Sequence, residues 1–179
     1  RFPMHPFQEI ATRFETFLKD NMPFPQKPAA LYDPCRYLLE AGGKRVRPAL
    51  CLMAHELFGG IDKDVFYAAM ALELFHNFTL IHDDIMDEAP LRRGRATIHA
   101  RYGLPSGILS GDVMNIYAYQ QLARIHPDHL TRILPVFNRT AIEVCEGQQM
   151  DMDFENKEDI TVDEYLKMIA LKTSVLLAS

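Results

Sequence analysis

The sequence predicts an all-α protein built from long helices. Apolar residues recur at helical spacing along most of the 179 residues. Sustained alternation of apolar and polar residues is missing, and so are the Asn-Gly and Asp-Gly pairs that mark tight hairpins. No internal repeat, low-complexity tract or linker interrupts the sequence, so we predict a single domain over residues 1–179.

The first two predicted helices are separated by prolines. Apolar residues at helical spacing predict a helix over residues 7–20, and the proline-rich stretch 23–28 ends it. A second helix covers about residues 29–41 and stops at Gly42-Gly43, because glycine readily takes the backbone conformation that closes a helix.

The next two helices have clear start signals. Pro48 fits the first turn of a third helix, which ends at Gly59-Gly60. Asp62 caps a long fourth helix that reaches about Asp87. The segment Pro90–Gly94 is predicted to be a loop.

The last three predicted helices follow from prolines and capping residues. Pro105 starts a long helix that ends before Pro127. Asp128 caps the next helix, in which Pro135 can introduce a kink. A capping box, Thr161-Val162-Asp163-Glu164, opens the last one.

Composition and charge narrow the class of protein. Hydrophobic residues make up 48% and charged residues 24%, which is typical of a globular protein and not of a disordered one. A net charge of -5 argues against a nucleic-acid partner. Cys35, Cys51 and Cys145 are widely spaced, so we interpret them as reduced thiols. Because neither a membrane span nor a signal peptide is visible, we predict a cytoplasmic protein.

An acidic cluster closes the predicted helix that begins after Asp62. One face of that helix presents residues spaced by four, three and four positions: His76, Leu80, Asp83 and Asp87. Like charges at this spacing, at the C-terminal end of a helix, are unfavourable unless a cation compensates them. Carboxylates on one face suit Mg²⁺, while the alternative interpretation is a solvated acidic helix end.

Two basic clusters flank the acidic one. Arg92-Arg93-Gly94-Arg95 follows it directly, and Gly43-Lys44-Arg45-Val46-Arg47-Pro48 precedes it in the sequence. Arginine binds phosphate oxygens in pairs, and glycine lets the backbone approach a ligand. A solvated basic surface is the alternative. In an acidic protein, however, two basic clusters beside a metal site suggest two anionic substrates.

These motifs, together with three downstream ones, resemble the trans-isoprenyl diphosphate synthases. The matching segments run in family order: Gly43–Pro48, His76–Asp87 with Arg92-Arg93-Gly94, Gly111-Asp112, Gly147-Gln148-Gln149-Met150-Asp151, and Lys172-Thr173. The resemblance implies the isoprenoid synthase fold, an antiparallel helix bundle around a central prenyl-chain cavity. It also implies a Mg²⁺-dependent prenyltransferase that condenses isopentenyl diphosphate with an allylic diphosphate, and a homodimer.

The resemblance also implies roles for single residues. Asp83 and Asp87 would ligate magnesium, with Asp84 in support. The residues implied for the allylic diphosphate are Arg92, Gln148, Lys172 and Thr173, of which Arg92 and Lys172 count with the three aspartates as catalytic. The residues implied for isopentenyl diphosphate are Lys44, Arg45, His76 and Arg93.

One expected motif of the family is missing from the sequence. The second aspartate-rich motif lies beyond Lys172 in the family, and the chain starts at Arg1 rather than Met and stops at Ser179 within an apolar helical pattern. We therefore expect a C-terminally truncated part of a longer, active protein.

Residues before the first aspartate bear on product length. In the family, bulky side chains four, five and eight positions before it form the floor of the chain pocket, and here these positions hold Thr79, Phe78 and Phe75. The two phenylalanines favour a short product, fifteen carbons first and twenty second. They can equally be plain core residues.

Three alternative functions remain open from the sequence. A non-catalytic, synthase-like subunit would explain the missing motif, although it need not keep every charged residue. A class I terpene cyclase shares the aspartate-rich site but has no use for Lys44-Arg45. A His-Asp phosphohydrolase, suggested by His82-Asp83, would need further histidine ligands that the sequence does not offer.

Overall fold

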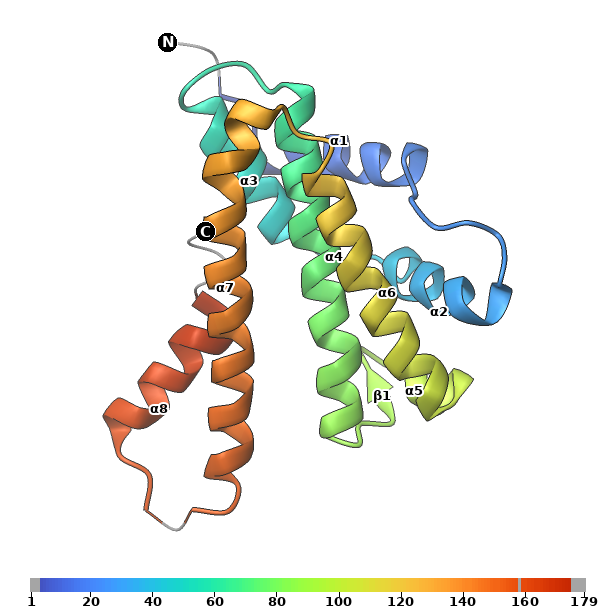
Figure 1. Cartoon of the computed structure of the whole chain (residues 1–179), viewed down its shortest axis with the longest axis vertical. Coiled ribbons are helices and arrows are strands. Elements are labelled where there is room, and N and C mark those ends of the chain that lie inside the picture. The colour runs from blue at the N-terminus through green and yellow to red at the C-terminus, as the bar shows by residue number, and fades with distance from the viewer. Residues whose placement is uncertain (1–3, 158, 175–179) are drawn as a thin grey trace. The chain divides into compact units, whose positions relative to one another are not determined.

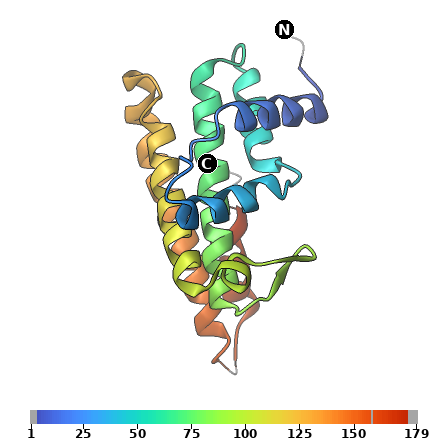
Figure 2. The same cartoon turned by 90° about the vertical axis from the view of Figure 1, so that its right-hand side faces the viewer.

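A computed structural model describes residues 4–157 and 159–174, with side chains up to Lys172. Helices make up almost all of the described part, and a single short hairpin interrupts them there (Figures 1 and 2). The chain forms two compact units, Arg1–Ile125 and His126–Ser179. The all-α class is therefore confirmed, while the single domain over 1–179 stays a prediction.

The first unit is organised around its longest helix. Its elements are α1 (Phe7–Asp20), α2 (Ala29–Glu40), α3 (Val46–Glu56), α4 (Lys63–Met86), β1 (Leu91–Arg92), β2 (Arg95–Ala96), α5 (Ile98–Tyr102) and α6 (Leu104–Leu122). Helices α4 and α6 run side by side along their length (Figures 1 and 2). The core that they share with α1, α2 and α3 contains large, fully buried side chains, among them Phe14, Leu39, Leu52, Leu74 and Met114.

Two glycines allow α6 to lie close against α4. A Cβ atom on Gly107 would lie 2.9 Å from the Ile85 side chain, and one on Gly111 would collide with the His82 ring. The imidazole Nε2 of His82 lies 3.1 Å from the Ile108 carbonyl oxygen of α6 and 3.8 Å from an Asp112 carboxylate oxygen. Since both neighbours are acceptors, Nε2 carries the proton and donates to α6. The end of α4 that carries the aspartates is thereby fixed against α6.

The second unit contains α7 (Pro127–Phe154), α8 (Val162–Ile169) and a short π-helix, η1 (Ala170–Ser174). The predicted capping box is confirmed, because the side chains of Thr161 and Glu164 each accept a hydrogen bond from the other's backbone. Gly147 of α7 lies so close to η1 that an added Cβ would be 2.6 Å from the Lys172 backbone nitrogen. Only glycine permits this approach, which places the Gly147–Asp151 and Lys172-Thr173 motifs in contact.

Several local predictions were wrong. Pro90–Gly94 is not a plain loop, because β1 and β2 pair antiparallel, with Arg92 opposite Arg95. The two turn residues, Arg93 and Gly94, have φ values of 52° and 77°, so the turn has the left-handed backbone of a tight hairpin. Helix α7 begins one residue before Asp128 and is capped by the His126 side chain. The helix α5 was not predicted at all.

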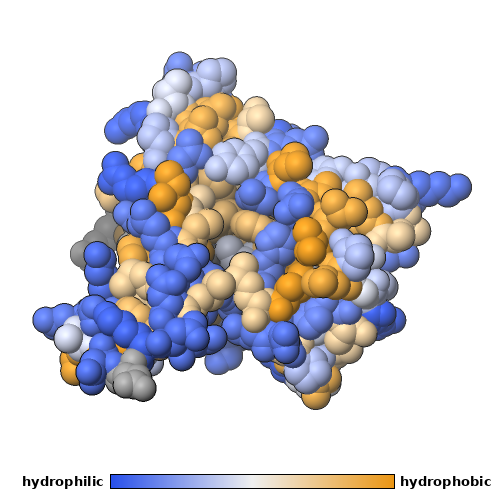
Figure 3. Space-filling model, turned by 60° about the horizontal axis from the view of Figure 1, so that its bottom comes forward, coloured by the Kyte–Doolittle hydropathy of each residue, from blue (hydrophilic) through white to orange (hydrophobic). Residues whose placement is uncertain are grey.

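No helix among the described residues is long and apolar enough to cross a membrane. Figure 3 shows apolar side chains exposed between hydrophilic ones on one face of the molecule.

Candidate anion-binding and metal site

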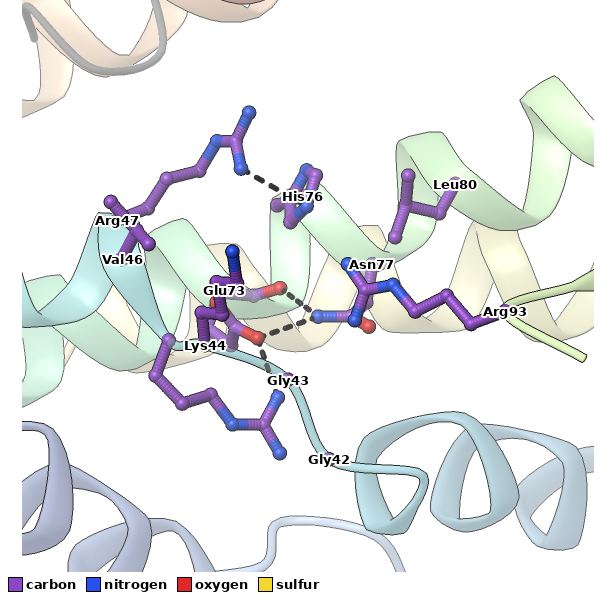
Figure 4. A pocket seen from close by; sticks show the side chains of 11 residues that line it. Gly42, Gly43, Lys44, Val46, Arg47, Glu73, His76, Asn77, Leu80 and Arg93 are labelled. Carbon is purple, nitrogen blue, oxygen red and sulfur yellow. Dashed lines mark hydrogen bonds and ion pairs between the residues drawn. The ribbon is translucent and has the colours of Figure 1, made fainter.

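A cavity of about 540 Å³ opens in the first unit between three segments. Figure 4 shows the turn before α3, the middle of α4 and the β1–β2 hairpin around it. Its lining residues are Gly42, Gly43, Lys44, Arg45, Val46, Arg47, Glu73, His76, Asn77, Leu80 and Arg93. Four of these are cationic and one is a carboxylate, so the cavity suits an anion.

Arg45 lines this cavity, but its donors are directed into the protein. Nε lies 2.8 Å from a Glu15 oxygen, Nη1 lies 2.6 Å from a Glu73 oxygen, and Nη2 donates to the Leu39 carbonyl at 2.6 Å. Burial alone would lower the pKa of Arg45, but the hydrogen bonds and charges of the two glutamates raise it above its ordinary value. The side chain therefore braces the turn, and its direct contact with a substrate stays a prediction.

Arg47 also lines the cavity, next to His76. Its Nη1 lies 3.2 Å from Nε2 of His76, as the dashed line in Figure 4 shows. Its Nε is buried and has no hydrogen-bond partner among the described protein atoms. A buried donor without a partner is costly, so an anion in the cavity would satisfy it. In the sequence, Arg47 is the second arginine of the basic motif Gly43–Pro48, but no role was predicted for it.

His76 is neutral in this environment. Burial, followed by the charges of Arg47, Arg92, Arg93 and Arg45, lowers the pKa of its imidazole to about 3. Because an arginine can only donate, Nε2 accepts and Nδ1 carries the proton. A diphosphate bound in the cavity would oppose the arginine charges and raise this pKa.

Glycine lets Arg93 approach the basic turn. A Cβ atom on Gly43 would lie 3.1 Å from Nη1 of Arg93. Arg93 and Arg45 also have left-handed backbone conformations, with φ of 52° and 49°. Non-glycine residues rarely adopt this conformation, and they concentrate at functional sites. The cavity therefore depends on two strained arginines and one glycine.

The acidic end of α4 lies next to this cavity along the same helix. Asp84 is 6% exposed, and both of its oxygens bind the Arg92 guanidinium at 2.9 Å. The hydrogen bonds to Asp84 raise the pKa of the Arg92 guanidinium. Burial acts in the opposite direction but has the smaller effect. Asp83 is half-buried and Asp87 is exposed one turn later, where its backbone N–H donates to the Asp83 carbonyl at 2.9 Å.

The donor set at this helix end fits magnesium in one specific way. Among the described residues, no group of three histidine, cysteine, aspartate or glutamate side chains could hold a metal ion. Two carboxylates one turn apart are nevertheless enough for Mg²⁺, which fills most of its shell with water and substrate phosphate oxygens. Asp84, bound to Arg92, is the least available of the three aspartates.

In the second unit, Lys172 contacts the Gly147–Asp151 motif. Nζ of Lys172 lies 2.5 Å from an Asp151 carboxylate oxygen, and the Gln148 side chain belongs to the same helix, α7. This charged hydrogen bond links the Lys172 side chain to the Gly147–Asp151 motif. The side chain of Thr173 lies outside the described residues.

Comparison with known proteins identifies the family. The sequence model described as polyprenyl synthetase matches residues 28–179. The chain belongs to this family. A geranylgeranyl diphosphate synthase of Methanosarcina mazei is 45% identical over 155 residues, which cover 86% of this chain and 48% of the relative. A geranylfarnesyl diphosphate synthase of Natronomonas pharaonis is 40% identical, over 86% of this chain and 50% of the relative.

Solved polyprenyl synthetase structures share the fold. The crystal structure of a geranylgeranyl pyrophosphate synthase superimposes with a TM-score of 0.93 at 51% identity, covering 97% of this chain and 53% of that one. The corresponding enzyme of Geoglobus acetivorans gives 0.90 at 39% identity, covering 95% and 56%. The predicted isoprenoid synthase fold is confirmed, and the chain spans about half the length of these relatives.

The three residues predicted to set product length lie on α4 before the aspartates. Phe75 is 2% exposed and packs edge-on against Phe78, with ring centres 5.5 Å apart. The Phe78 ring also lies 4.9 Å from the His82 ring. The hydroxyl of Thr79 donates to the His76 carbonyl at 2.7 Å. Phe75 is thus a core residue, whereas Phe78 and Thr79 are half-buried and more accessible to a ligand.

Proposed function

We propose that this chain is part of a prenyltransferase that condenses isopentenyl diphosphate with an allylic diphosphate. The observation that supports this most is the cationic cavity beside the aspartates of α4, because it offers separate places for two diphosphates. Membership of the polyprenyl synthetase family agrees with this chemistry. The reaction needs no protein nucleophile: it needs charge that stabilises a departing diphosphate, and it needs the two substrates held in line.

Isopentenyl diphosphate is proposed to occupy the cavity. Lys44, Arg47 and Arg93 supply the positive charge, and His76 supplies a hydrogen bond from Nδ1. Arg45 acts through its ion pairs with Glu15 and Glu73, which keep Lys44 and Arg47 on the correct side of the turn.

The allylic diphosphate is proposed to bind at the acidic end of α4. Asp83 and Asp87 hold magnesium there, while Asp84 orients the Arg92 guanidinium. Bound magnesium contributes positive charge against the leaving diphosphate. Gln148, Lys172 and Thr173 are proposed to contact the same group.

A product of twenty carbons is our first choice. The sequence alone favoured fifteen carbons because of Phe75 and Phe78, and that prediction stands as the second choice. Several relatives at about 40% identity are geranylgeranyl diphosphate synthases, and the small Thr79 leaves space one turn before the first aspartate. We also propose a homodimer, as the family resemblance implies.

The experiment that tests the function uses both this chain and the natural gene product that contains it. Each is incubated with magnesium, isopentenyl diphosphate and dimethylallyl, geranyl or farnesyl diphosphate, and the products are identified by mass spectrometry. A longer prenyl diphosphate supports the proposal. A hydrocarbon would indicate a terpene cyclase, and the absence of any product from the natural protein would indicate a non-catalytic subunit.

A further inference from the structure

Tyr37 of α2 contacts the arginine hairpin and the segment after it at several points. Its hydroxyl donates to the Ala96 carbonyl at 3.0 Å. The guanidinium carbons of Arg95 and Arg101 each lie 4.4 Å from the centre of its ring. The ring also packs edge-on against Tyr102, with centres 5.7 Å apart. One half-buried aromatic ring therefore joins α2 to β2 and α5.

The hairpin needs such an anchor. Its strands have two residues each, and isolated two-stranded hairpins are marginally stable in water. Hydrogen bonds from Thr97 to the Ala89 and Pro90 carbonyls close the loop on itself rather than fixing it to α2. The Asp84–Arg92 ion pair joins β1 to α4, but a cavity of about 80 Å³ lies between the hairpin and α4, so the β2 side needs a further contact.

The same helix that carries Tyr37 leads directly into the basic turn. Helix α2 ends at Glu40, and Gly42 follows two residues later. Tyr37 thus lies less than one helical turn before the end of α2, and the turn with Lys44 and the first residues of α3 with Arg47 follow. A movement of the hairpin relative to α2 would change the spacing between this turn and Arg93.

We infer that Tyr37 is a positioning residue that sets the spacing between the two cationic clusters of the cavity. The expected effect on diphosphate binding rests on the proposed function. The role of Tyr37 in holding the hairpin against α2 does not. Guanidinium groups gain from lying over an aromatic face, and the gain remains when the ring is phenylalanine. The hydroxyl contributes one further hydrogen bond to the hairpin backbone.

Two variants separate the ring from the hydroxyl. Tyr37→Leu removes the ring–guanidinium contacts and the hydroxyl hydrogen bond, whereas Tyr37→Phe removes the hydrogen bond alone. Tyr165→Leu, an exposed tyrosine on α8, serves as the matched control. Hydrogen exchange of the Thr97 amide, which donates to the Pro90 carbonyl at 3.1 Å, reports the order of the hairpin. Calorimetric titration with inorganic pyrophosphate reports anion binding.

For Tyr37→Leu we expect about tenfold faster exchange of this amide and about tenfold weaker pyrophosphate binding, since two ring–guanidinium contacts are lost. Tyr37→Phe should restore most of both quantities, and the control should change neither. In the natural protein, Tyr37→Leu should raise KM for isopentenyl diphosphate and leave kcat unchanged. Unchanged exchange in a folded Tyr37→Leu protein would overturn the inference.

A second pair of variants keeps the test decisive if Tyr37→Leu does not fold. Arg95 and Arg101 are exposed, so Arg95→Gln and Arg101→Gln should leave the fold intact while removing the same contacts. Faster exchange of the Thr97 amide in the double variant supports the inference, and unchanged exchange overturns it. If the unmodified chain fails to bind pyrophosphate, the proposed function fails, while the exchange measurement still decides the role of Tyr37.

Discussion

Asp84 and Arg92 form a two-pronged ion pair, with Nε and Nη2 of the arginine each 2.9 Å from a different oxygen of the carboxylate. The pair joins the end of α4 to β1, so it fixes one cationic cluster to the helix that carries the aspartates. Because Asp84 is 6% exposed, the carboxylate end of this pair is shielded from solvent.

Removing Arg92 should therefore destabilise the protein more than removing an exposed arginine. Arg92→Gln leaves a buried carboxylate without its partner, and we expect a loss of about 3 kcal/mol in the free energy of unfolding. Urea denaturation measures this loss. Arg132→Gln is the control, since Arg132 is exposed on α7. If Asp84→Asn and Arg92→Gln were fully additive in the double variant, the pair would not be coupled as described.

The buried ion pairs of Arg45 should differ in strength. The Glu73 side chain is 6% exposed and the Glu15 side chain is 31% exposed. We expect Glu73→Gln to cost about 3 kcal/mol, because it removes half of a buried pair. Glu15→Gln should cost about 1 kcal/mol or less, since solvent screens that charge. Thermal unfolding, with the exposed Glu40→Gln as control, would contradict this ranking if both variants were equally stable.

A methyl group at residue 43 should weaken anion binding without loss of stability. In Gly43→Ala the new Cβ crowds the Arg93 guanidinium, whose flexible side chain must move away from the cavity. We expect about threefold weaker pyrophosphate binding, because the loss of one exposed charge–charge contact has an effect of about this size. Gly60→Ala is the matched control, because nothing lies within 4 Å of its added Cβ. Equal affinities of the two variants would show that the approach of Arg93 to the turn is unimportant for binding.

His76 should make the protein less stable as the pH falls. The pKa of its imidazole is about 3 in the folded chain, against an ordinary value of 6.5, so the unfolded chain binds more protons between these values. Stability from this group is complete above pH 6.5 and decreases as the pH falls towards 3. Between about pH 7 and pH 5, the free energy of unfolding should therefore decline less in His76→Gln than in the unmodified chain. Parallel pH profiles would contradict the assignment.

Binding should reverse this effect at the same residue. A bound diphosphate raises the pKa of His76, so binding near pH 6 should take up protons. Isothermal titration in buffers of different ionisation enthalpy measures the uptake, and subtraction of the His76→Gln value removes the contribution of pyrophosphate itself. No difference between the two proteins would place the anion elsewhere.

Phe78 should be the better test of product length. Phe75→Ala empties a fully buried position and should cost about 4 kcal/mol. Phe78 is half-buried, so its truncation to Ala should be milder and should lengthen the prenyl product of the natural protein. Chromatography of the products, with Phe58→Ala as the control because Phe58 is 91% exposed, gives the answer. An unchanged product distribution in Phe78→Ala would exclude this residue from the pocket floor.

The sequence predicts the helices well where periodicity and capping agree. The first helix was predicted over 7–20 and is observed at Phe7–Asp20, and Asp62 caps α4 as expected. The hairpin was missed because its turn uses Arg93-Gly94, and arginine is not a residue that signals a left-handed turn. Tertiary structure overrides the local preference at that position.

The candidate site shows a similar division. The motifs matched to the family grouped Lys44, Arg45, His76 and Arg93, which all line the cavity. They could not distinguish Arg45 from Arg47, since only the fold decides which guanidinium meets Glu15 and Glu73. The ion pair between Asp84 and Arg92 was also invisible, because it depends on how the hairpin folds back.

Gly107 and Gly111 of α6 differ in how an alanine substitution would affect the protein. Replacing helical glycines with alanine usually strengthens a helix, and a designer would choose these two positions of α6 first. Here a new methyl group on Gly111 would collide with the His82 ring, whereas one on Gly107 would meet the flexible end of the Ile85 side chain, which can give way. An alanine at Gly111 would therefore push against the end of α4 that carries Asp83 and Asp87, the two residues proposed to hold magnesium.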